Sequence, residues 1–253
     1  DKLFINNFKN KIEFKNVSFN NSNKKILNNI SFILKKGSSM GITGKTASGK
    51  TSIANLILKN YQSKNIFFDD VEINEINKAS IRQRVIYVPQ NPVIFSGTIR
   101  ENVSFFDKKK NDEKIFNCLE ISGFIKDLKK LPKGIDEIVG ERGVSLSGGQ
   151  RQRLSLARAL YQNPQMLIID DTLSSLDVDT ELNILKKIKK EFNNKFLVII
   201  SSRISTIYSM DKILVLDSGE IVEDGSSEEL SKNKSLFKEL LNIQKILPGE
   251  SNA

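Results

Sequence analysis

The sequence has no histidine and only one cysteine, Cys118. A single cysteine cannot form a disulfide within the chain, which favours a reducing, cytosolic setting. Because histidine is missing altogether, no site in the chain can use an imidazole as a base, a proton carrier or a metal ligand.

Long apolar runs are missing as well. The longest, such as residues 196–200, fall far short of the ~20 apolar residues that a membrane-spanning helix needs, so we expect that this chain alone does not cross a bilayer. No signal peptide is evident and the sequence begins at Asp1 rather than Met, so we expect a piece of a longer protein. Its 253 residues suffice for one large domain or for a core with an attached lobe.

Basic residues outnumber acidic ones, 39 against 30, which gives a formal net charge of +9. Such an excess can favour a polyanionic partner or an anionic membrane surface. Here the lysines are scattered along the chain without interleaved aromatic residues, which is weak evidence for nucleic-acid binding. We therefore expect a solvated basic surface and no nucleic-acid partner.

Residues 44–51 match the phosphate-binding loop pattern at every position: two glycines five residues apart, then lysine, then serine or threonine. The glycines let successive backbone N–H groups point at phosphate oxygens. Lys50 can reach the outer phosphates as a point charge, and the Thr51 hydroxyl can be a ligand of Mg²⁺. A plain flexible loop is the alternative interpretation of this stretch taken alone.

The residues on either side favour the phosphate loop. Residues 39–43 are predicted to form a short buried strand. Apolar residues then recur at helical spacing, at Ile53, Leu56, Ile57 and Tyr61. This gives the order of strand, loop and helix that the motif needs. The start of the helix adds a favourable partial charge and free N–H donors for an anion.

The remaining pattern predicts a mixed α/β fold. Short apolar runs over residues 11–34 predict an antiparallel β layer, and 66–73 predicts a further strand pair. Continuous apolar runs at 166–169 and 196–200 predict strands buried on both faces of a sheet, and 84–88 predicts another buried strand.

Helices and turns complete this prediction. A mostly helical lobe, residues 91–163, is predicted as an insertion in the core. A helix over about 179–192 and a hairpin that turns at Ser218-Gly219 follow. Amphipathic helices are expected near Glu228 and over 235–245, with a loose tail after them.

Two further motifs fit a nucleotide site. Asp170 follows the buried strand at 166–169, where its carboxylate can hold Mg²⁺ opposite Thr51, although acidic residues at strand ends are common. The run Leu146-Ser147-Gly148-Gly149-Gln150 is far less common. Ser147 can cap a helix there and leave the N–H groups of two glycines open to an anion. A plain N-cap is the alternative interpretation of this run.

With these motifs in order, the sequence resembles the ATP-binding cassette (ABC) family over nearly its whole length. The corresponding family elements are Walker A at residues 44–51, the Q-loop at Gln90, the signature at 146–150, Walker B at 166–170 and the D-loop at 174–177. Residues 139–143 resemble the X-loop of exporters, which lies near the helices that couple to membrane domains. The exporter type is therefore our expectation.

The resemblance implies a single nucleotide-binding domain. Its fold would be a P-loop NTPase (RecA-like) α/β core with an antiparallel β subdomain and an inserted α-helical subdomain. The implied boundaries are about 11–90 and 164–245 for the core, about 91–163 for the helical subdomain and 246–253 for the tail. Residues 1–10 would end a linker from a transmembrane domain in the same longer chain, with a frayed terminus as the alternative.

The family's activity is ATP-driven transport from the cytoplasmic face of a membrane, with ATP and Mg²⁺ as cofactors. Two such domains stack head to tail, so that each nucleotide lies between the Walker A of one chain and the signature of the other. The resemblance assigns nucleotide binding to Gly44, Lys45, Thr46, Ala47, Ser48, Gly49, Lys50, Thr51, Ser52, Gln90, Ser147, Gly148, Gly149 and Gln150. It assigns Mg²⁺ binding to Thr51, Gln90 and Asp170, and catalysis to Lys50, Gln90, Asp171 and Ser202.

Three positions depart from the family pattern. The residue after the Walker B aspartate is usually Glu, which positions the attacking water, but here it is Asp171. Its carboxylate is set back by roughly 1.5 Å, and misplacement by about 1 Å can lower a rate on the order of 10²-fold. Ser202 replaces the family's switch histidine. Asn21 replaces the aromatic that stacks on adenine, and nearby Phe19 is expected to be a core residue.

A chain that lacks both the Glu and the His but keeps an intact signature resembles one of the two halves of the heterodimeric exporters. We therefore expect a chain that binds MgATP, hydrolyses it slowly at its own Walker site and completes the active site of a non-identical partner. A homodimeric exporter with two slow sites stays open, as does a soluble ABC protein that acts as a nucleotide switch or on nucleic acid. The short interval from Thr51 to Leu146 is evidence against the last.

Overall fold

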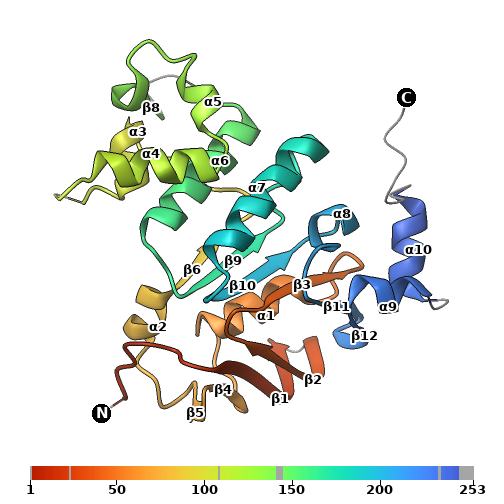
Figure 1. The fold of residues 1–253 in the computed structure, drawn as a ribbon. Coiled ribbons are helices and arrows are strands. Elements are labelled where there is room, and N and C mark those ends of the chain that lie inside the picture. Colours follow the sequence, from red (N-terminus) through yellow and green to blue (C-terminus); the bar gives the residue numbers. More distant parts are fainter. Residues whose placement is uncertain (1, 23, 108, 141–144, 233–234, 245–253) are drawn as a thin grey trace.

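The computed structural model describes residues 2–22, 24–107, 109–140, 145–232 and 235–244. Its larger sheet has six strands in the order β12-β11-β3-β10-β9-β6, shown in Figure 1. Their bounds are Ser39–Gly44 for β3, Val85–Val88 for β6, Met166–Asp170 for β9, Phe196–Ile200 for β10, Lys212–Asp217 for β11 and Glu220–Gly225 for β12. Neighbouring strands are parallel except for the pair β11 and β12.

The centre of this sheet positions the predicted site. β3, β9 and β10 are buried along their whole length, as their apolar runs predict. β10 lies between β3 and β9 and is parallel to both. The carboxyl ends of the three strands therefore share one edge of the sheet, and the segments that follow them begin side by side.

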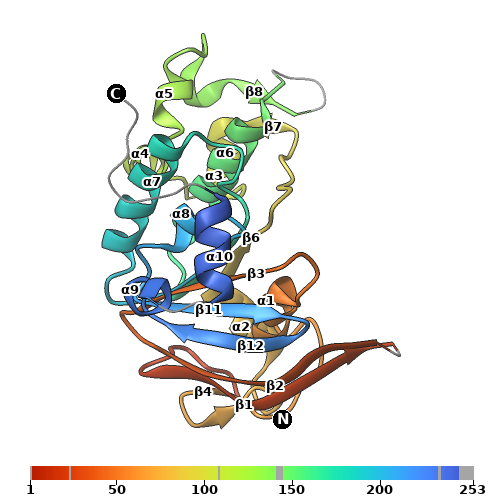
Figure 2. The same ribbon diagram turned by 90° about the vertical axis from the view of Figure 1, so that its right-hand side faces the viewer.

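The predicted antiparallel layer is a four-stranded sheet in the order β2-β1-β4-β5. β1 spans Lys11–Asn21, β2 Lys24–Lys35, β4 Ile66–Phe68 and β5 Val71–Glu72, and all pairs are antiparallel. Phe14 of β1 stacks on Phe32 of β2 with ring centroids 4.4 Å apart. Figure 2 shows this sheet below the larger one, and its apolar face shares a core with β3 and α1 (Lys50–Ile57).

The stretch predicted as a helical lobe is mostly helical where it is described. It contains α3 (Ile99–Ser104), α4 (Asp112–Ile121), α5 (Ile125–Leu128) and α6 (Gly148–Tyr161), which lie in the upper part of Figure 1. It also holds a 3-10 helix, Gly134–Asp136, and a ribbon of β7 (Gly97–Thr98) and β8 (Ile138–Val139). The sequence pattern does not predict this ribbon, because strands of two residues carry no detectable period.

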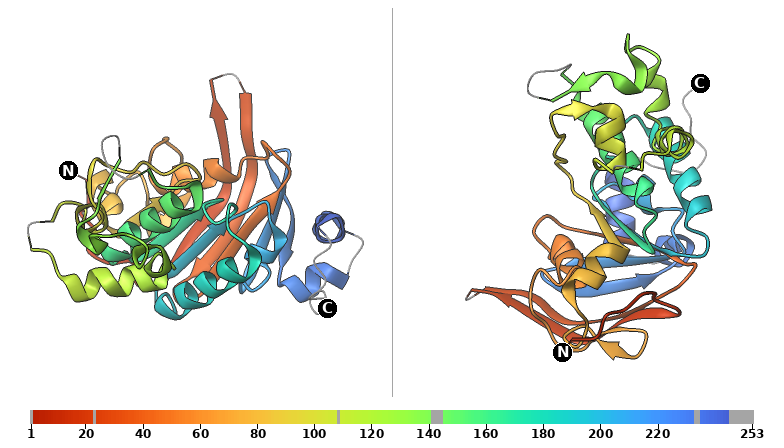
Figure 3. Two further views of the ribbon diagram at one scale, coloured as in Figure 1. Left: turned by 90° about the horizontal axis from the view of Figure 1, so that it is seen from above. Right: turned by 90° about the vertical axis from the view of Figure 1, so that its left-hand side faces the viewer.

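The remaining helices are α2 (Lys78–Arg84), α7 (Val178–Glu191), α8 (Ile204–Ile207), α9 (Ser227–Lys232) and α10 (Leu236–Ile243). α7, α9 and α10 lie where the pattern predicts helices, and the predicted hairpin at Ser218-Gly219 joins β11 to β12. In Figure 3 (left), the blue helices α9 and α10 lie at the opposite end of the molecule from the green helical part.

The predicted extent of the first helix is wrong at its end. α1 stops at Ile57, and Tyr61 lies beyond it with 39% of its surface exposed. The physical reason is Lys59, whose φ of 53° is left-handed and cannot continue a right-handed helix.

The segment before β1 is fixed to the rest of the domain. Leu3 pairs with Ile76, and Phe8 is buried against Phe68 with ring centroids 4.6 Å apart. Residues 141–143 of the expected X-loop and the expected tail, 246–253, lie outside the described residues. Within the described part of the chain, no helix is both long enough and apolar enough to cross a membrane.

Lys59 is a buried lysine that ties the end of α1 to the segment after β5. Only 9% of its surface is exposed, and Nζ donates to the carbonyl oxygens of Ile73 at 2.7 Å, Asn74 at 3.2 Å and Ile76 at 2.5 Å. Burial lowers the pKa of the ammonium group. The three carbonyl acceptors offset the cost of placing a charge at this position.

We predict that Lys59→Met lowers the free energy of unfolding by about 2 kcal/mol, because it leaves three carbonyl groups without their donor. Lys64→Met is the matched control, since Lys64 is exposed. It should change the free energy of unfolding by less than about 0.5 kcal/mol. Urea unfolding followed by circular dichroism measures both variants, and equal stabilities would contradict a stabilising role for the Lys59 contacts.

Candidate nucleotide-binding site

The phosphate loop runs from the end of β3 to the start of α1, and glycine is needed at both of its ends. Gly44 has a φ of 136°, and a Cβ there would lie 1.9 Å from the carbonyl oxygen of Leu216. Gly49 has a φ of 100°, and a Cβ there would lie 2.6 Å from Leu27 Cδ2. Only glycine combines such conformations with such close approaches. The two sheets therefore fix the path of the loop from both sides.

Lys50 lies in the first turn of α1 and folds back onto the loop. Its Nζ donates to the carbonyl oxygens of Gly44 at 2.9 Å and Lys45 at 2.8 Å. Burial lowers the pKa of Lys50, while the carboxylates of Asp171 and Asp170 oppose that shift. The ammonium group is thus held against the loop backbone, where the motif predicts a phosphate contact.

The loop presents polar groups that lack protein partners. Ser48 Oγ of the loop and Thr43 Oγ1 of the preceding strand β3 are buried and have no hydrogen-bond partner among the described residues. Residues 47–52 line a cavity of about 280 Å³ together with Lys24 and Ile26. A triphosphate supplies acceptor oxygens for the hydroxyl, ammonium and backbone N–H groups of this cradle, so the residues present fit such a group.

The other predicted loop residues are less enclosed. The side chains of Lys45 and Thr46 are exposed, and Lys45 Nζ pairs with Asp217 Oδ2 at 2.7 Å. Ala47 has a φ of 62°, and the Ser52 N–H donates to the Gly49 carbonyl at 3.0 Å. Ala47 and Ser52 therefore shape the loop through their backbone, whereas Lys45 ties it to Asp217 through its side chain.

Asp170, at the end of β9, lies within hydrogen-bond distance of the phosphate loop. Its Oδ2 accepts from Thr51 Oγ1 at 2.8 Å and from the Tyr87 hydroxyl at 2.8 Å. Burial raises the pKa of Asp170, and these two hydrogen bonds oppose the rise. The structure thus brings together Thr51 and Asp170, the hydroxyl and carboxylate expected to hold Mg²⁺, and both are oxygen donors that this ion prefers.

Tyr87 is a site residue for which the sequence pattern gives no signal. Its strand β6 runs parallel to β9 with Tyr87 opposite Ile168, two positions before Asp170, so Tyr87 and Asp170 share a face of the sheet. Burial, followed by the nearby Asp170 carboxylate, raises the pKa of the Tyr87 hydroxyl. The hydroxyl therefore stays protonated at neutral pH and donates a hydrogen bond to Asp170.

Asp171 occupies the position where the family usually has Glu, with a left-handed φ of 44°. Its N–H donates to the Ile200 carbonyl at 2.8 Å. Its Oδ1 accepts from Ser201 Oγ at 3.1 Å and from the Ser202 N–H at 3.1 Å, with Ser202 Oγ at 3.5 Å. The two positions that depart from the catalytic pattern, Asp171 and Ser202, therefore contact each other directly.

Gln90 lies two residues after β6, close in sequence to the site but without a described side-chain contact to it. Its side chain is exposed, and its carbonyl oxygen accepts from Gln152 Nε2 at 3.4 Å. The metal-binding and catalytic roles expected of Gln90 stay predictions.

The signature residues begin α6, and the predicted N-cap at Ser147 is confirmed. Ser147 Oγ accepts from the Gln150 N–H at 3.3 Å, and Gln150 Oε1 accepts from the Ser147 N–H at 2.8 Å, which forms a capping box. Gly148 is open, since the atom nearest to a Cβ there would be Arg151 Nη2 at 4.0 Å. Among the hydrogen bonds of the described residues, none joins residues 147–150 to the phosphate loop.

The expected adenine position has no ring. Asn21 is exposed at the end of β1. Phe19 is buried and stacks on Tyr61 with ring centroids 4.9 Å apart, which confirms the prediction that Phe19 is a core residue. The side chains outside the loop that line its cavity are those of Lys24 and Ile26, so a base placed there would meet an aliphatic surface.

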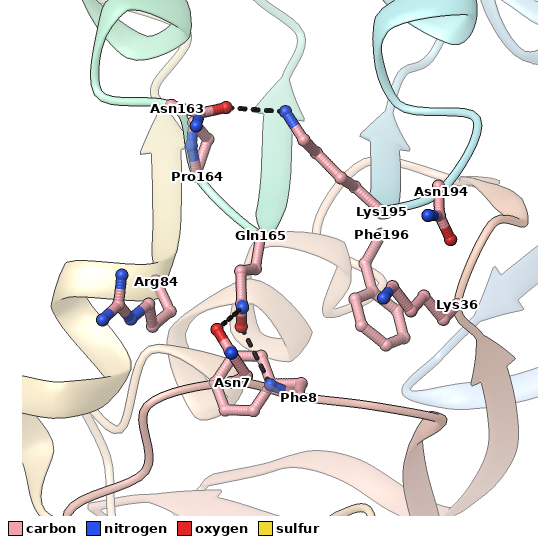
Figure 4. A pocket seen from close by; sticks show the side chains of 10 residues that line it. All are labelled: Asn7, Phe8, Lys36, Arg84, Asn163, Pro164, Gln165, Asn194, Lys195 and Phe196. Carbon is pink, nitrogen blue, oxygen red and sulfur yellow. Dashed lines mark hydrogen bonds between the residues drawn. The ribbon is translucent and has the colours of Figure 1, made fainter.

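A second cavity, of about 320 Å³, lies at the amino ends of β6, β9 and β10 and is shown in Figure 4. Some of its polar groups pair with one another: Lys195 Nζ donates to Asn163 Oδ1 at 2.8 Å, and Gln165 Oε1 accepts from the Phe8 N–H at 2.9 Å. Arg84 Nε is buried there without a hydrogen-bond partner among the described residues. The phosphate loop begins at the opposite, carboxyl end of the sheet. This cavity therefore contributes nothing to the nucleotide site.

Comparison with known proteins assigns the family, since the ABC transporter family matches residues 27–174. The chain is 40% identical over 238 residues to a putative export ATP-binding/permease protein of Rickettsia conorii, covering 92% of this chain and 41% of that protein. It is 40% identical over 243 residues to the probable multidrug resistance ABC transporter ATP-binding/permease protein YheI of Bacillus subtilis, covering 94% and 42%. A solved bacterial Atm1-family ABC exporter with ATP bound matches with a TM-score of 0.89 and 32% identity, covering 97% of this chain and 44% of that one.

This chain therefore belongs to the ABC transporter family. It is an ATP-binding domain of exporter type with the α/β fold of P-loop NTPases, as its sequence predicts. The chain spans about two fifths of the length of the curated relatives it matches. The domain boundaries and the roles of single site residues stay predictions.

We predict that Tyr87→Phe weakens MgATP binding by about tenfold, because it removes a hydrogen bond to a charged group, which is worth ~1.5–3 kcal/mol. Binding of ATP in the presence of a chelator should change by less than about twofold, since Tyr87 acts through Asp170 at the expected metal position. Tyr61→Phe is the matched control, as Tyr61 lies beyond the far end of α1. Isothermal titration calorimetry measures both affinities, and an equal loss with and without Mg²⁺ would contradict this role.

Proposed function

We propose that this chain is the motor domain of an ABC exporter, which binds and hydrolyses ATP on the cytoplasmic face of a membrane to power substrate translocation. The relatives named above are ATP-binding/permease proteins, and this chain spans about two fifths of their length. Both facts support a transmembrane domain in the same longer polypeptide as part of the proposal.

In the proposed site, the loop backbone and Lys50 bind the phosphates, and Thr51 with Asp170 binds Mg²⁺. The metal ion neutralises charge on the phosphate oxygens. Tyr87 keeps the Asp170 carboxylate in place through their 2.8 Å hydrogen bond. Gln90 is the third group that we assign to the metal.

The proposed active unit is a head-to-tail pair of ABC domains. Within this chain the signature has no described hydrogen bond to the phosphate loop, and Gly148 is open. Stacking two chains head to tail would bring the start of α6 to the partner's nucleotide, where free N–H groups and the helix dipole favour an anion. We propose a non-identical partner, because Asp171 and Ser202 leave this chain's own Walker site short of two catalytic groups.

The position of Asp171 is the observation that supports our proposal of slow hydrolysis at this chain's own Walker site. Its Oδ1 lies 3.1 Å from both Ser201 Oγ and the Ser202 nitrogen, so the loop after β10 occupies this oxygen. A Glu would extend roughly 1.5 Å further toward the nucleotide. Loss of a general base lowers a rate on the order of 10² to 10⁴-fold. The site therefore binds MgATP without turning it over quickly.

The surface that we assign to the membrane domain is an apolar groove between β6 and α6. Its cavity of about 310 Å³ is lined by Pro92, Val93, Phe105 and Arg158, among others. Val93 is 66% exposed and Phe105 is 54% exposed. Large exposed apolar side chains gathered at one groove are typical of an interaction site. Because Tyr87 lines this groove and donates to Asp170, movement of the docked domain would reach the nucleotide site.

We predict that the isolated chain binds MgATP but hydrolyses it slowly, and that its partner raises total turnover by about 10²-fold or more. Gly148→Asp in this chain should abolish the gain, because its carboxylate repels the partner's nucleotide in a place with room for the side chain. Asp171→Asn should leave most of the gain. Steady-state phosphate release measures each mixture. Fast turnover by the isolated chain would contradict the proposal, and a gain that depends on Asp171 would indicate two equivalent sites.

We predict that Asp171→Glu combined with Ser202→His raises hydrolysis at this chain's own Walker site by about tenfold or more, since it restores a longer carboxylate and an imidazole. The single variant Ser202→His is the control for the imidazole alone. Single-turnover assays with radiolabelled ATP measure the rate. No gain in the double variant would show that the substitutions at these two positions are not what limits the site.

A further inference from the structure

Gln244 joins the last described helix to the loop that holds Asp171. Its Oε1 accepts from the Ile204 N–H at 2.8 Å, and its Nε2 donates to the Ser202 carbonyl at 2.8 Å. One carboxamide thus pairs with two backbone groups of the segment between β10 and α8. No motif in the sequence points to Gln244, which lies 42 positions after Ser202.

The helix that carries Gln244 is itself firmly placed. Phe237 is 0% exposed and Leu241 is 6% exposed, and both pack into the same core as the apolar residues of α8. Gln244 follows Leu241 by three positions and Phe237 by seven, so it continues the same face of the helix. At the other end of α10, Glu223 Oε1 accepts from the Leu236 N–H at 2.6 Å. The carboxamide therefore projects from a fixed support.

The backbone that Gln244 holds is the backbone that binds Asp171. The Ser202 N–H donates to Asp171 Oδ1 at 3.1 Å, while the Ser202 carbonyl accepts from Gln244. The Ser201 N–H donates to the Ile42 carbonyl at 3.0 Å, which fixes the near end of the loop to β3. Two hydrogen bonds through Ser202 thus connect α10 to the Asp171 carboxylate.

We propose that Gln244 is a positioning residue for nucleotide hydrolysis, which sets the place of the Ser202 backbone and through it the Asp171 carboxylate. This inference rests on the proposed role of Asp171 in the chain's own Walker site. Among the described residues, the Gln244 side chain has no hydrogen bond to the phosphate loop or to Asp171, so we assign its effect to the segment between β10 and α8. Without its carboxamide, the Ile204 N–H at the buried start of α8 loses its acceptor, which favours displacement of the loop.

The test compares Gln244→Met with Asn242→Met in the full transporter that contains this chain. Methionine keeps the length and helix propensity of glutamine but can form neither hydrogen bond. Asn242 is exposed at the same end of α10, so its variant is a matched control.

The single-turnover rate is measured with the partner's Walker lysine replaced, so that only the site of this chain contributes to the measured rate. Gln244→Met should raise this rate about tenfold and change the Kd for MgATP by less than about twofold, because a displaced loop no longer occupies the Asp171 carboxylate, and a misplacement of about 1 Å can change a rate on the order of 10²-fold. Asn242→Met should change neither quantity.

Hydrogen exchange without nucleotide gives an independent readout. Peptides that contain Ile204 should exchange about tenfold faster in Gln244→Met and at an unchanged rate in Asn242→Met, because only the first loses the acceptor of that N–H. Unchanged exchange would overturn the contact itself. Faster exchange with an unchanged rate of hydrolysis would overturn the positioning role alone. Absence of MgATP binding in the unmodified transporter would instead overturn the proposed function, and the positioning role with it.

Discussion

The hydrogen bonds between the Asp171 carboxylate and the loop after β10 are the interaction on which the character of this nucleotide site depends. β9 and β10 are adjacent and parallel, so the residues that follow them meet at one edge of the sheet. Asp171 turns there through a left-handed conformation and finds two donors at 3.1 Å, Ser201 Oγ and the Ser202 N–H. A longer carboxylate would change this arrangement, whereas an imidazole in place of Ser202 would keep the N–H donor and remove only the Ser202 Oγ contact at 3.5 Å. The carboxylate therefore holds the loop after β10, at the position where the proposed function places the group that positions the attacking water.

The groups expected to bind nucleotide surround the phosphate loop. Gly44 and Gly49 fix the loop against neighbouring strands, and Lys50 rests on the loop carbonyls. Ser48 Oγ is buried without a partner among the described residues. These groups are arranged for an anion, whereas Asp171 is occupied by its own chain. These arrangements support the proposal that this domain favours binding over turnover and offers its signature to the nucleotide of a partner.

The sequence predicts those features that depend on local pattern. The buried strands, the hairpin and the cap of α6 follow from apolar runs and turn chemistry. The prediction for the end of α1 is wrong because Lys59 adopts a left-handed φ of 53°, which the apolar pattern does not reveal. Tyr87 and Gln244 are invisible to motifs, because their partners lie 83 and 42 positions away and only strand order and helix packing bring them together. The role expected of Gln90 stays a prediction, because among the described residues its one hydrogen bond is made by its carbonyl oxygen and not by its side chain.

The most direct measurement is the fate of nucleotide at each site of the working transporter. Photo-crosslinking with radiolabelled 8-azido-ATP, applied after many turnovers, identifies the nucleotide attached to each chain. Retention of the triphosphate on this chain, together with diphosphate on its partner, is the result that the proposed function predicts, since it assigns slow hydrolysis to the Asp171 site. Diphosphate on this chain at the rate of overall turnover would contradict a binding site that hydrolyses slowly.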